Sequence, residues 1–98
     1  MHVASLTLDL RLRSVHSLKE KRSVLRPIID GSRRRFLVAA AEVGHQDAWQ
    51  LANVGMAAVS SSPSHAEDVL DAVERFVWSF PEVEVISSSR SCMSSEDA

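Results

Sequence analysis

Hydrophobic and polar residues alternate strictly along residues 3–12. Leu6, Leu8, Leu10 and Leu12 fall on one side of this segment, and polar or small residues fall on the other. A period of two over so many residues is typical of a β-strand with one buried face. The segment therefore predicts the first strand of a sheet.

The next segment repeats its hydrophobic residues at helical spacing. Ser17 and Glu20 have the spacing of a capping box, so a helix is expected from this point to about Arg35. Pro27 falls inside the helix and should bend it, and Gly31 should weaken it further.

A second amphipathic helix is predicted between residues 64 and 79. Ser64 and Glu67 form another capping-box pattern, and hydrophobic residues recur from there at positions i, i+3, i+4 and i+7. Pro81 is expected to stop this helix.

Three further segments are predicted to be strands, at residues 36–43, 49–59 and 83–88. The first two are separated by the turn sequence Gly44-His45-Gln46-Asp47, which predicts a hairpin. Four serines and an acidic end follow the last strand, so residues 91–98 are expected to be a disordered tail.

The order strand, helix, strand, strand, helix, strand predicts an α+β fold over residues 1–90. It is the order of the ferredoxin-like βαββαβ sandwich, in which two helices cover one face of a four-stranded antiparallel sheet. Right-handed crossovers give the strand order 4-1-3-2.

Two sequence blocks resemble one bacterial family. Residues 17–25, SLKEKRSVL, and residues 41–50, AEVGHQDAWQ, are similar to the two signature blocks of the YlxP-like proteins. The resemblance covers roughly residues 2–90. It implies the ferredoxin-like fold and no settled activity. Genes of this family often lie beside those of transcription, translation and ribosome maturation factors, which implies an association with RNA or the ribosome.

Composition limits the class of protein. A chain of 98 residues, 45% of them hydrophobic, has room for one domain. Neither a signal peptide nor a membrane-spanning segment is evident, so a cytoplasmic protein without membrane contact is expected. Cys92 is the sole cysteine, so an internal disulfide is excluded.

The net charge of −2 conceals a strong segregation. Residues 11–35 hold nine basic and two acidic side chains, whereas residues 36–98 hold two basic and ten acidic ones. A candidate anion- or RNA-binding surface on the first helix comprises Lys19, Lys21, Arg22, Arg26 and Arg33. Alternatively, acidic residues 67–74 of the second helix neutralise these cations by ion pairing.

The turn between the second and third strands is a candidate partner contact. Its residues are His45, Gln46, Asp47 and Trp49. His45 and Asp47 could bind a metal or share a proton, but no further ligands are evident, so no metal and no cofactor are expected. An Asx-turn at Asp47 is the structural alternative.

The sheet face away from the helices is predicted to be too apolar to stay solvated, which favours a homodimer or another protein partner. The residues expected at the dimer contact are Val3, Leu37, Leu51 and Val59. Stacking of RNA bases on this face is disfavoured, because the first strand contains no aromatic residue.

No catalytic residue is assigned. Arg13 and Asn53 correspond to the residue types of ferredoxin-like acylphosphatases, but the segment after the first strand lacks a glycine for a phosphate loop. The favoured function is a non-catalytic module that contacts RNA or a ribosomal subunit. The alternatives are a protein–protein adaptor and, third, an acylphosphatase-like hydrolase.

Overall fold

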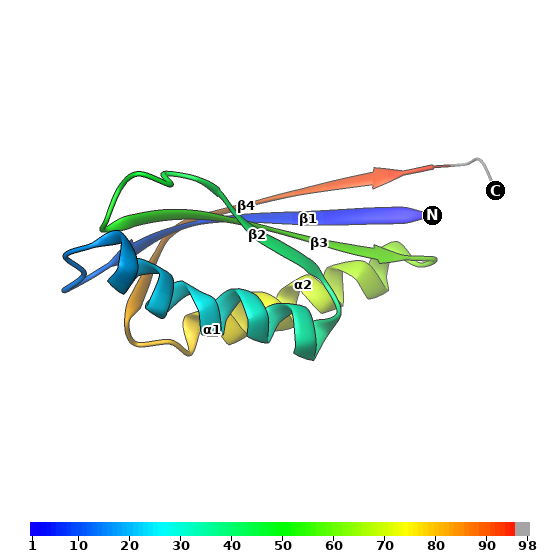
Figure 1. The fold of residues 1–98 in the computed structure, drawn as a ribbon. Coiled ribbons are helices and arrows are strands. Elements are labelled where there is room, and N and C mark those ends of the chain that lie inside the picture. Colours follow the sequence, from blue (N-terminus) through cyan, green and yellow to red (C-terminus); the bar gives the residue numbers. More distant parts are fainter. Residues whose placement is uncertain (96–98) are drawn as a thin grey trace.

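The structure, a computed structural model, describes residues 1–95 and consists of a four-stranded antiparallel sheet with two helices. Figure 1 shows both helices on the same side of the sheet. The strand order β2-β3-β1-β4 confirms the predicted 4-1-3-2 topology. The elements in chain order are β1 (His2–Leu12), α1 (Leu18–Phe36), β2 (Ala39–Gly44), β3 (Leu51–Ser60), α2 (Pro63–Trp78) and β4 (Val83–Ser94).

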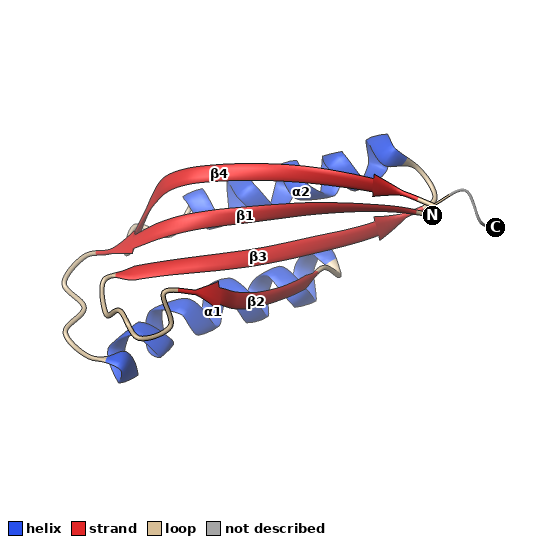
Figure 2. Cartoon of the chain, turned by 90° about the horizontal axis from the view of Figure 1, so that it is seen from above, coloured by secondary structure: helices blue, strands red, loops and turns tan. Residues whose placement is uncertain are grey.

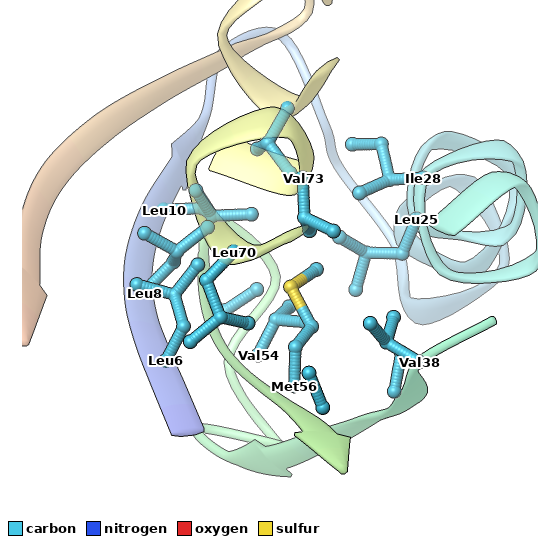
Figure 3. Close-up of a cluster of buried hydrophobic side chains, with 14 of the residues drawn as sticks. Leu6, Leu8, Leu10, Leu25, Ile28, Val38, Val54, Met56, Leu70 and Val73 are labelled. Atoms are coloured by element: carbon cyan, nitrogen blue, oxygen red, sulfur yellow. The ribbon is translucent and has the colours of Figure 1, made fainter. Parts of the chain in front are cut away.

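The hydrophobic core lies between the sheet and the two helices. Alternate residues of β1, from Ala4 to Leu12, are fully buried, as the alternating pattern predicts. Figure 3 shows Leu6, Leu8 and Leu10 of β1 meeting Leu70 and Val73 of α2 in this layer. The α2 helix packs against β1 and β3 and also reaches β4, whereas α1 packs against the edge strand β2 (Figure 2). The flank of α1 beyond β2 is therefore left open to solvent.

The two helices begin at serine caps. Ser17 accepts a hydrogen bond from the Glu20 N–H at 3.1 Å, which confirms the predicted start of α1. The prediction for α2 is wrong by two residues, since Ser62 is the N-cap and Pro63 occupies the first helical position. Proline is well suited to that position because its missing N–H would have no helical partner there.

The junction between α1 and β2 lies later than predicted. Phe36 belongs to the helix, and its ring packs edge-on against Phe76 with 5.6 Å between ring centroids. Leu37 then ends the helix with a left-handed backbone, φ 54°, and its N–H donates to the Arg33 carbonyl. For these reasons β2 begins only at Ala39.

Strand β4 is twice as long as the predicted strand. It pairs with β1 as far as Ser94, opposite His2, so the prediction of a disordered tail from residue 91 is wrong for residues 91–94. The cause is the length of β1, whose eleven residues offer main-chain partners to the end of the sheet. The rest of the predicted tail, residues 96–98, lies outside the described residues.

Candidate nucleic-acid interface

Three cations project from the solvent-facing side of α1. Lys19, Arg22 and Arg26 are exposed and follow the spacing i, i+3, i+7, which places them on one helix face. Within residues 1–95, no acidic side chain forms an ion pair with any of the three. We call these three residues the α1 basic face.

A shallow hollow of about 190 Å³ adjoins the α1 basic face, between the helix and β2. Arg22 and Arg26 flank it together with Asp30 and Glu42, and Leu25 and Ile29 complete its lining. The two guanidinium groups are therefore presented beside a small partly apolar surface.

The acidic residues of α2 do not neutralise this face. Three of the four pair with Arg90 of β4 instead: Nη1 lies 3.0 Å from Glu67 and 2.7 Å from Asp71, and Nη2 lies 2.9 Å from Glu74. These carboxylates raise the pKa of Arg90, with the hydrogen bond to Glu74 the largest cause. Among the described residues, the alternative of ion pairing between the two helices is thus not observed.

Lys21 does not belong to the exposed face, and its assignment as an RNA contact is wrong. Its side chain is 2% exposed, and Nζ lies 2.7 Å from the Glu42 carboxylate. The ammonium also donates to the carbonyls of His45 and Ala48, each at 2.7 Å. Three oxygen atoms thus surround a group with three protons, which is what a buried charge requires.

The contacts of Lys21 bring the two sequence blocks together. Glu42, His45 and Ala48 belong to the second block, and Lys21 belongs to the first. We call this set of contacts the Lys21 latch. The Gln50 side chain adds a hydrogen bond of 3.1 Å to the Val15 carbonyl, just before α1. As a result, the β2–β3 loop is fastened to the first turns of α1.

The sequence contained a signal for this burial. Lys21 precedes Leu25, Ile28 and Ser32 by four, seven and eleven residues, and all four side chains are buried on one helix face. A lysine in phase with the hydrophobic stripe of an amphipathic helix is therefore a candidate for a buried charge, provided that an acceptor is available.

Arg33 is exposed but already has partners. Its Nε and Nη2 donate to the Ala40 carbonyl at 3.0 and 2.6 Å, and Nη1 lies 3.5 Å from Asp30. The side chain is thus held at the outer edge of β2. A contact with a phosphate would have to compete with these interactions.

The loop between β2 and β3 presents the predicted partner residues at one end of the molecule. His45, Gln46 and Asp47 are exposed, and Trp49 is 52% exposed. The turn is closed by a hydrogen bond from the Ala48 N–H to the His45 carbonyl, with His45 in a left-handed conformation, φ 55°.

The hairpin residues are not part of a recognisable metal site. A shallow hollow of about 560 Å³ lies beside Trp49 and is also lined by Arg11 and Asp47. In the part of the chain that the structure describes, no three His, Cys, Asp or Glu side chains gather closely enough to share a metal ion.

The open face of the sheet is divided into an apolar half and a polar half. Ala39, Ala41 and Val43 of β2 pack beside Gly55 and Ala57 of β3 around a hollow of about 350 Å³. In contrast, β1 and β4 contribute Ser5, Thr7 and Asp9 opposite Ser91, Ser89 and Ser87. The expectation of an apolar face holds for the β2–β3 half and for the end of the β1–β4 half, where Val3 lies opposite Met93.

Three of the predicted dimer contacts lie on the open face, and the fourth does not. Val3 is opposite Val59 in the β1–β3 ladder, and Leu51 is at the other end of β3. Leu37 is the C-cap of α1 and precedes β2, so its placement on the sheet was wrong, although its side chain is 88% exposed.

Asp9 organises the polar half of the open face. It accepts a hydrogen bond of 2.7 Å from the Asn53 side chain and one of 2.9 Å from the Ser87 hydroxyl, and it thereby links three strands. These two hydrogen bonds lower the pKa of Asp9, with that from Asn53 the larger cause.

Arg13 and Asn53, the residues considered for acylphosphatase-like hydrolysis, are each bound to another side chain. Arg13 Nη2 lies 3.0 Å from Glu84, and Asn53 binds Asp9 on the open face. Each of the two side chains thus has a carboxylate as its partner. The structure shows no contact that joins Arg13 and Asn53.

Sequence comparison places the chain in a family. Residues 3–90 match the family described as "Protein of unknown function (DUF503)". This chain belongs to that family. A relative in Bacillus subtilis (strain 168), "Uncharacterized protein YlxP", is 48% identical over 68 residues, which are 69% of this chain and 74% of the relative. The predicted resemblance to the YlxP-like proteins is thereby confirmed.

Two solved structures share the fold of this DUF503 member. A designed protein with a ferredoxin fold, LFR1 1, is 7% identical and superposes with a TM-score of 0.57 over 98% of this chain and 88% of its own. SnoaB, a cofactor-independent oxygenase from Streptomyces nogalater, is 8% identical, with a TM-score of 0.51 over 99% and 95% of the two chains. At these identities the likeness shows the ferredoxin-like fold alone.

No helix within residues 1–95 combines the length and the apolar character needed to cross a bilayer.

Proposed function

We propose that the protein binds RNA, and in particular a ribosomal subunit, through the α1 basic face. The observation that carries the proposal is that Lys19, Arg22 and Arg26 are exposed on one face and unpaired among the described residues. Three α2 carboxylates that could have neutralised them, those of Glu67, Asp71 and Glu74, are bound to Arg90.

The chemistry of this face suits a phosphate backbone. Arginine presents a planar fork of N–H donors that matches two oxygens of a phosphate, and Lys19 adds a point charge. Lys19 also lies in the first turn of α1, where the helix dipole is positive and a nearby anion is stabilised. Contacts of this kind read no bases, so low sequence specificity is expected.

The β2–β3 loop supplies a second contact in this proposal. The Lys21 latch fixes the loop beside the first turns of α1, so its exposed residues are held near the α1 basic face. Trp49 is the aromatic side chain available there for stacking on an unpaired base. Binding to a ribosomal subunit would place the protein in the cytoplasm.

A charge-reversal experiment tests the proposal. The variant Arg22→Glu, Arg26→Glu is expected to lose at least tenfold in affinity for ribosomal RNA and isolated small subunits at fixed salt. The matched control is Arg13→Glu, Arg75→Glu, which changes the net charge equally at exposed residues outside α1 and should retain most of the affinity.

Two outcomes would contradict RNA binding through α1. Equal losses in both variants would show that net charge, and no defined surface, sets the affinity. Absence of wild-type binding at low salt would exclude an RNA surface altogether. Circular dichroism of each variant establishes that the fold is intact.

A second candidate function is a protein–protein adaptor, favoured by the apolar half of the open face. The hollow lined by Ala41, Val43 and Gly55 is shallow and apolar, which suits a protein partner. This surface is on the side of the sheet opposite the helices. A complex formed there would therefore survive the Arg22→Glu, Arg26→Glu exchange and be lost on Ala41→Glu.

A further inference from the structure

The two outer strands of the sheet differ in how their edges are protected. At β2, the Ala40 carbonyl points away from β3 and accepts both Nε and Nη2 of Arg33. This strand is six residues long, whereas β4 at the other edge is twelve residues long. A short edge covered by an arginine is poorly suited to pairing with another strand.

The pairing of β4 with β1 identifies the main-chain groups at its free edge. Ser95 donates its N–H to the Met1 carbonyl at 2.9 Å, and the Met1 amino group donates to the Ser95 carbonyl at 3.3 Å. Hydrogen-bonded pairs recur at every second position of an antiparallel ladder, so the odd-numbered residues from Ser87 to Ser95 bond to β1, up to the register shift between Asp9 and Leu10. The main-chain N–H and C=O groups of the even-numbered residues point away from β1. These outward residues are Ser88, Arg90, Cys92 and Ser94.

The other side of β1 supports this assignment. The Leu12 N–H donates to the Gln50 carbonyl at 2.9 Å, so even-numbered residues of β1 bond to β3 and odd-numbered ones bond to β4. The four outward residues of β4 therefore form a row of donors and acceptors with no main-chain partner in the described structure.

We propose that a second copy of this chain pairs with the free edge of β4 in an antiparallel ladder. The strand is self-complementary in the register that places Ser91 opposite Ser91 of the second copy. Arg90 then lies opposite Cys92, and Ser88 lies opposite Ser94, so all four outward residues are paired. Shifting the register to put Arg90 opposite itself would place like charges on directly paired residues, which is unfavourable.

The side chains along β4 allow such an approach. Every residue from Ile86 to Ser94 is exposed, most are serines, and no proline interrupts the stretch. Arg90 is the charged residue of this stretch, and its guanidinium is directed to the carboxylates of α2.

The resulting dimer has a continuous eight-stranded sheet with all four helices on one side. A two-fold axis through the Ser91 pair is perpendicular to the sheet, so it keeps the helices of both copies on the same face. In Figure 2, α1 lies beneath the β2 edge, far from β4, so the α1 basic face stays free in this dimer. Dimerisation through β4 and RNA binding through α1 would therefore use separate surfaces.

Disulfide crosslinking tests the register. Ser91→Cys in a Cys92→Ser background places two thiols across the axis, at a non-hydrogen-bonded pair with Cα atoms about 4.5 Å apart, which a disulfide can span. The matched control is Ser89→Cys in the same background. In the proposed register, residue 89 lies opposite residue 93 of the second copy. The cysteines introduced at position 89 of the two copies are therefore about 13 Å apart along the strand and should not crosslink. Crosslinking of Ser89→Cys as fast as Ser91→Cys would overturn the proposed register.

The mass in solution tests the dimer itself. Light scattering of the wild-type protein is expected to give twice the monomer mass of 10.8 kDa. Cys92→Pro removes an outward N–H and should give a monomer with an intact core. A monomeric wild type at all concentrations would overturn the proposal, as would a dimer that survives Cys92→Pro, because it would have to use another surface.

Discussion

At the scale of single residues, Lys21 is the charge on which the position of the β2–β3 loop depends. Its ammonium is buried, forms an ion pair with one carboxylate and donates hydrogen bonds to two main-chain carbonyls. A buried charge is tolerated when polar groups compensate it. Removing the charge leaves those buried polar groups without a partner. The lysine therefore has a structural role, although it lies between two exposed cations in the sequence.

Replacing Lys21 should destabilise the fold far more than replacing its exposed neighbour. Lys21→Met keeps most of the side-chain volume but leaves the Glu42 carboxylate and the Ala48 carbonyl without the ammonium as a partner, so a loss of about 3 kcal/mol is expected. Lys19→Met should change the free energy of unfolding by less than about 0.5 kcal/mol. Urea unfolding measures both, and similar values for the two variants would contradict the Lys21 latch.

Asp9 predicts a pH-dependent contribution to stability. Because hydrogen bonds from Asn53 and Ser87 lower its pKa in the folded state, ionised Asp9 stabilises the fold above the unfolded-state pKa of about 3.9. That contribution disappears as the pH falls through the lowered folded-state pKa. Asp9→Asn should thus be less stable than wild type at pH 7, and the difference should shrink below about pH 4.

Thermal unfolding at several pH values would check the contribution of Asp9. A difference in melting temperature between wild type and Asp9→Asn that stays constant from neutral to acidic pH would show that the charge of Asp9 has no part in linking the strands.

At the scale of elements, the packing of the two helices depends on Gly31. A Cβ atom built at this glycine would lie 2.6 Å from the Phe76 ring of α2, well inside contact distance. The ring cannot easily move, because it packs edge-on against Phe36 and Phe80, and the Arg35 guanidinium lies 5.0 Å from its centroid. The glycine is therefore explained by the close approach of α2.

Gly31→Ala should destabilise the protein despite a better helix propensity. The alanine gains about 1 kcal/mol in α1, whereas overpacking against Phe76 costs about 1–3 kcal/mol, so the net effect is a loss. In a Phe76→Leu background the clash is relieved, and the same substitution should become neutral or stabilising. A double-mutant cycle measured by chemical denaturation detects this coupling, and additive effects would contradict it.

Strand β4 shows how an element can depend on its neighbour. Serine is a poor strand former, and the sequence after residue 88 has no alternating hydrophobic pattern. The strand nevertheless continues to Ser94, because β1 supplies hydrogen-bond partners along its whole length. Local sequence does not reveal such a strand, since its cause lies more than eighty residues away in the chain.

At the scale of the whole molecule, much of the fold follows from local patterns in the sequence. The alternation in β1, the Ser17 cap and the six-element order lead directly to the observed topology. The helix boundaries at Ser62 and Phe36 were misplaced by local errors, whereas the errors at the candidate site concern long-range contacts. The carbonyls that accept from Lys21 come from a loop at residues 45–48. Asp71 of α2 forms an ion pair with Arg90, a residue expected at the end of the domain.

The same long-range contacts determine which charges remain free. Arg33 is held by Ala40 and Asp30, Lys21 is buried, and three of the α2 carboxylates pair with Arg90. Of the five predicted cations, Lys19, Arg22 and Arg26 are left exposed without an ion pair in the described region. The charge segregation visible in the sequence is therefore retained on one flank of the folded protein.

The salt dependence of RNA binding tests the central claim most directly. Affinity for ribosomal RNA should fall steeply as the salt concentration rises, because each phosphate contact releases condensed counterions. For Arg22→Glu, Arg26→Glu, the slope of log K against log salt should be smaller in magnitude by about 1 for each lost contact. A variant slope equal to that of the wild type would contradict an RNA surface on α1.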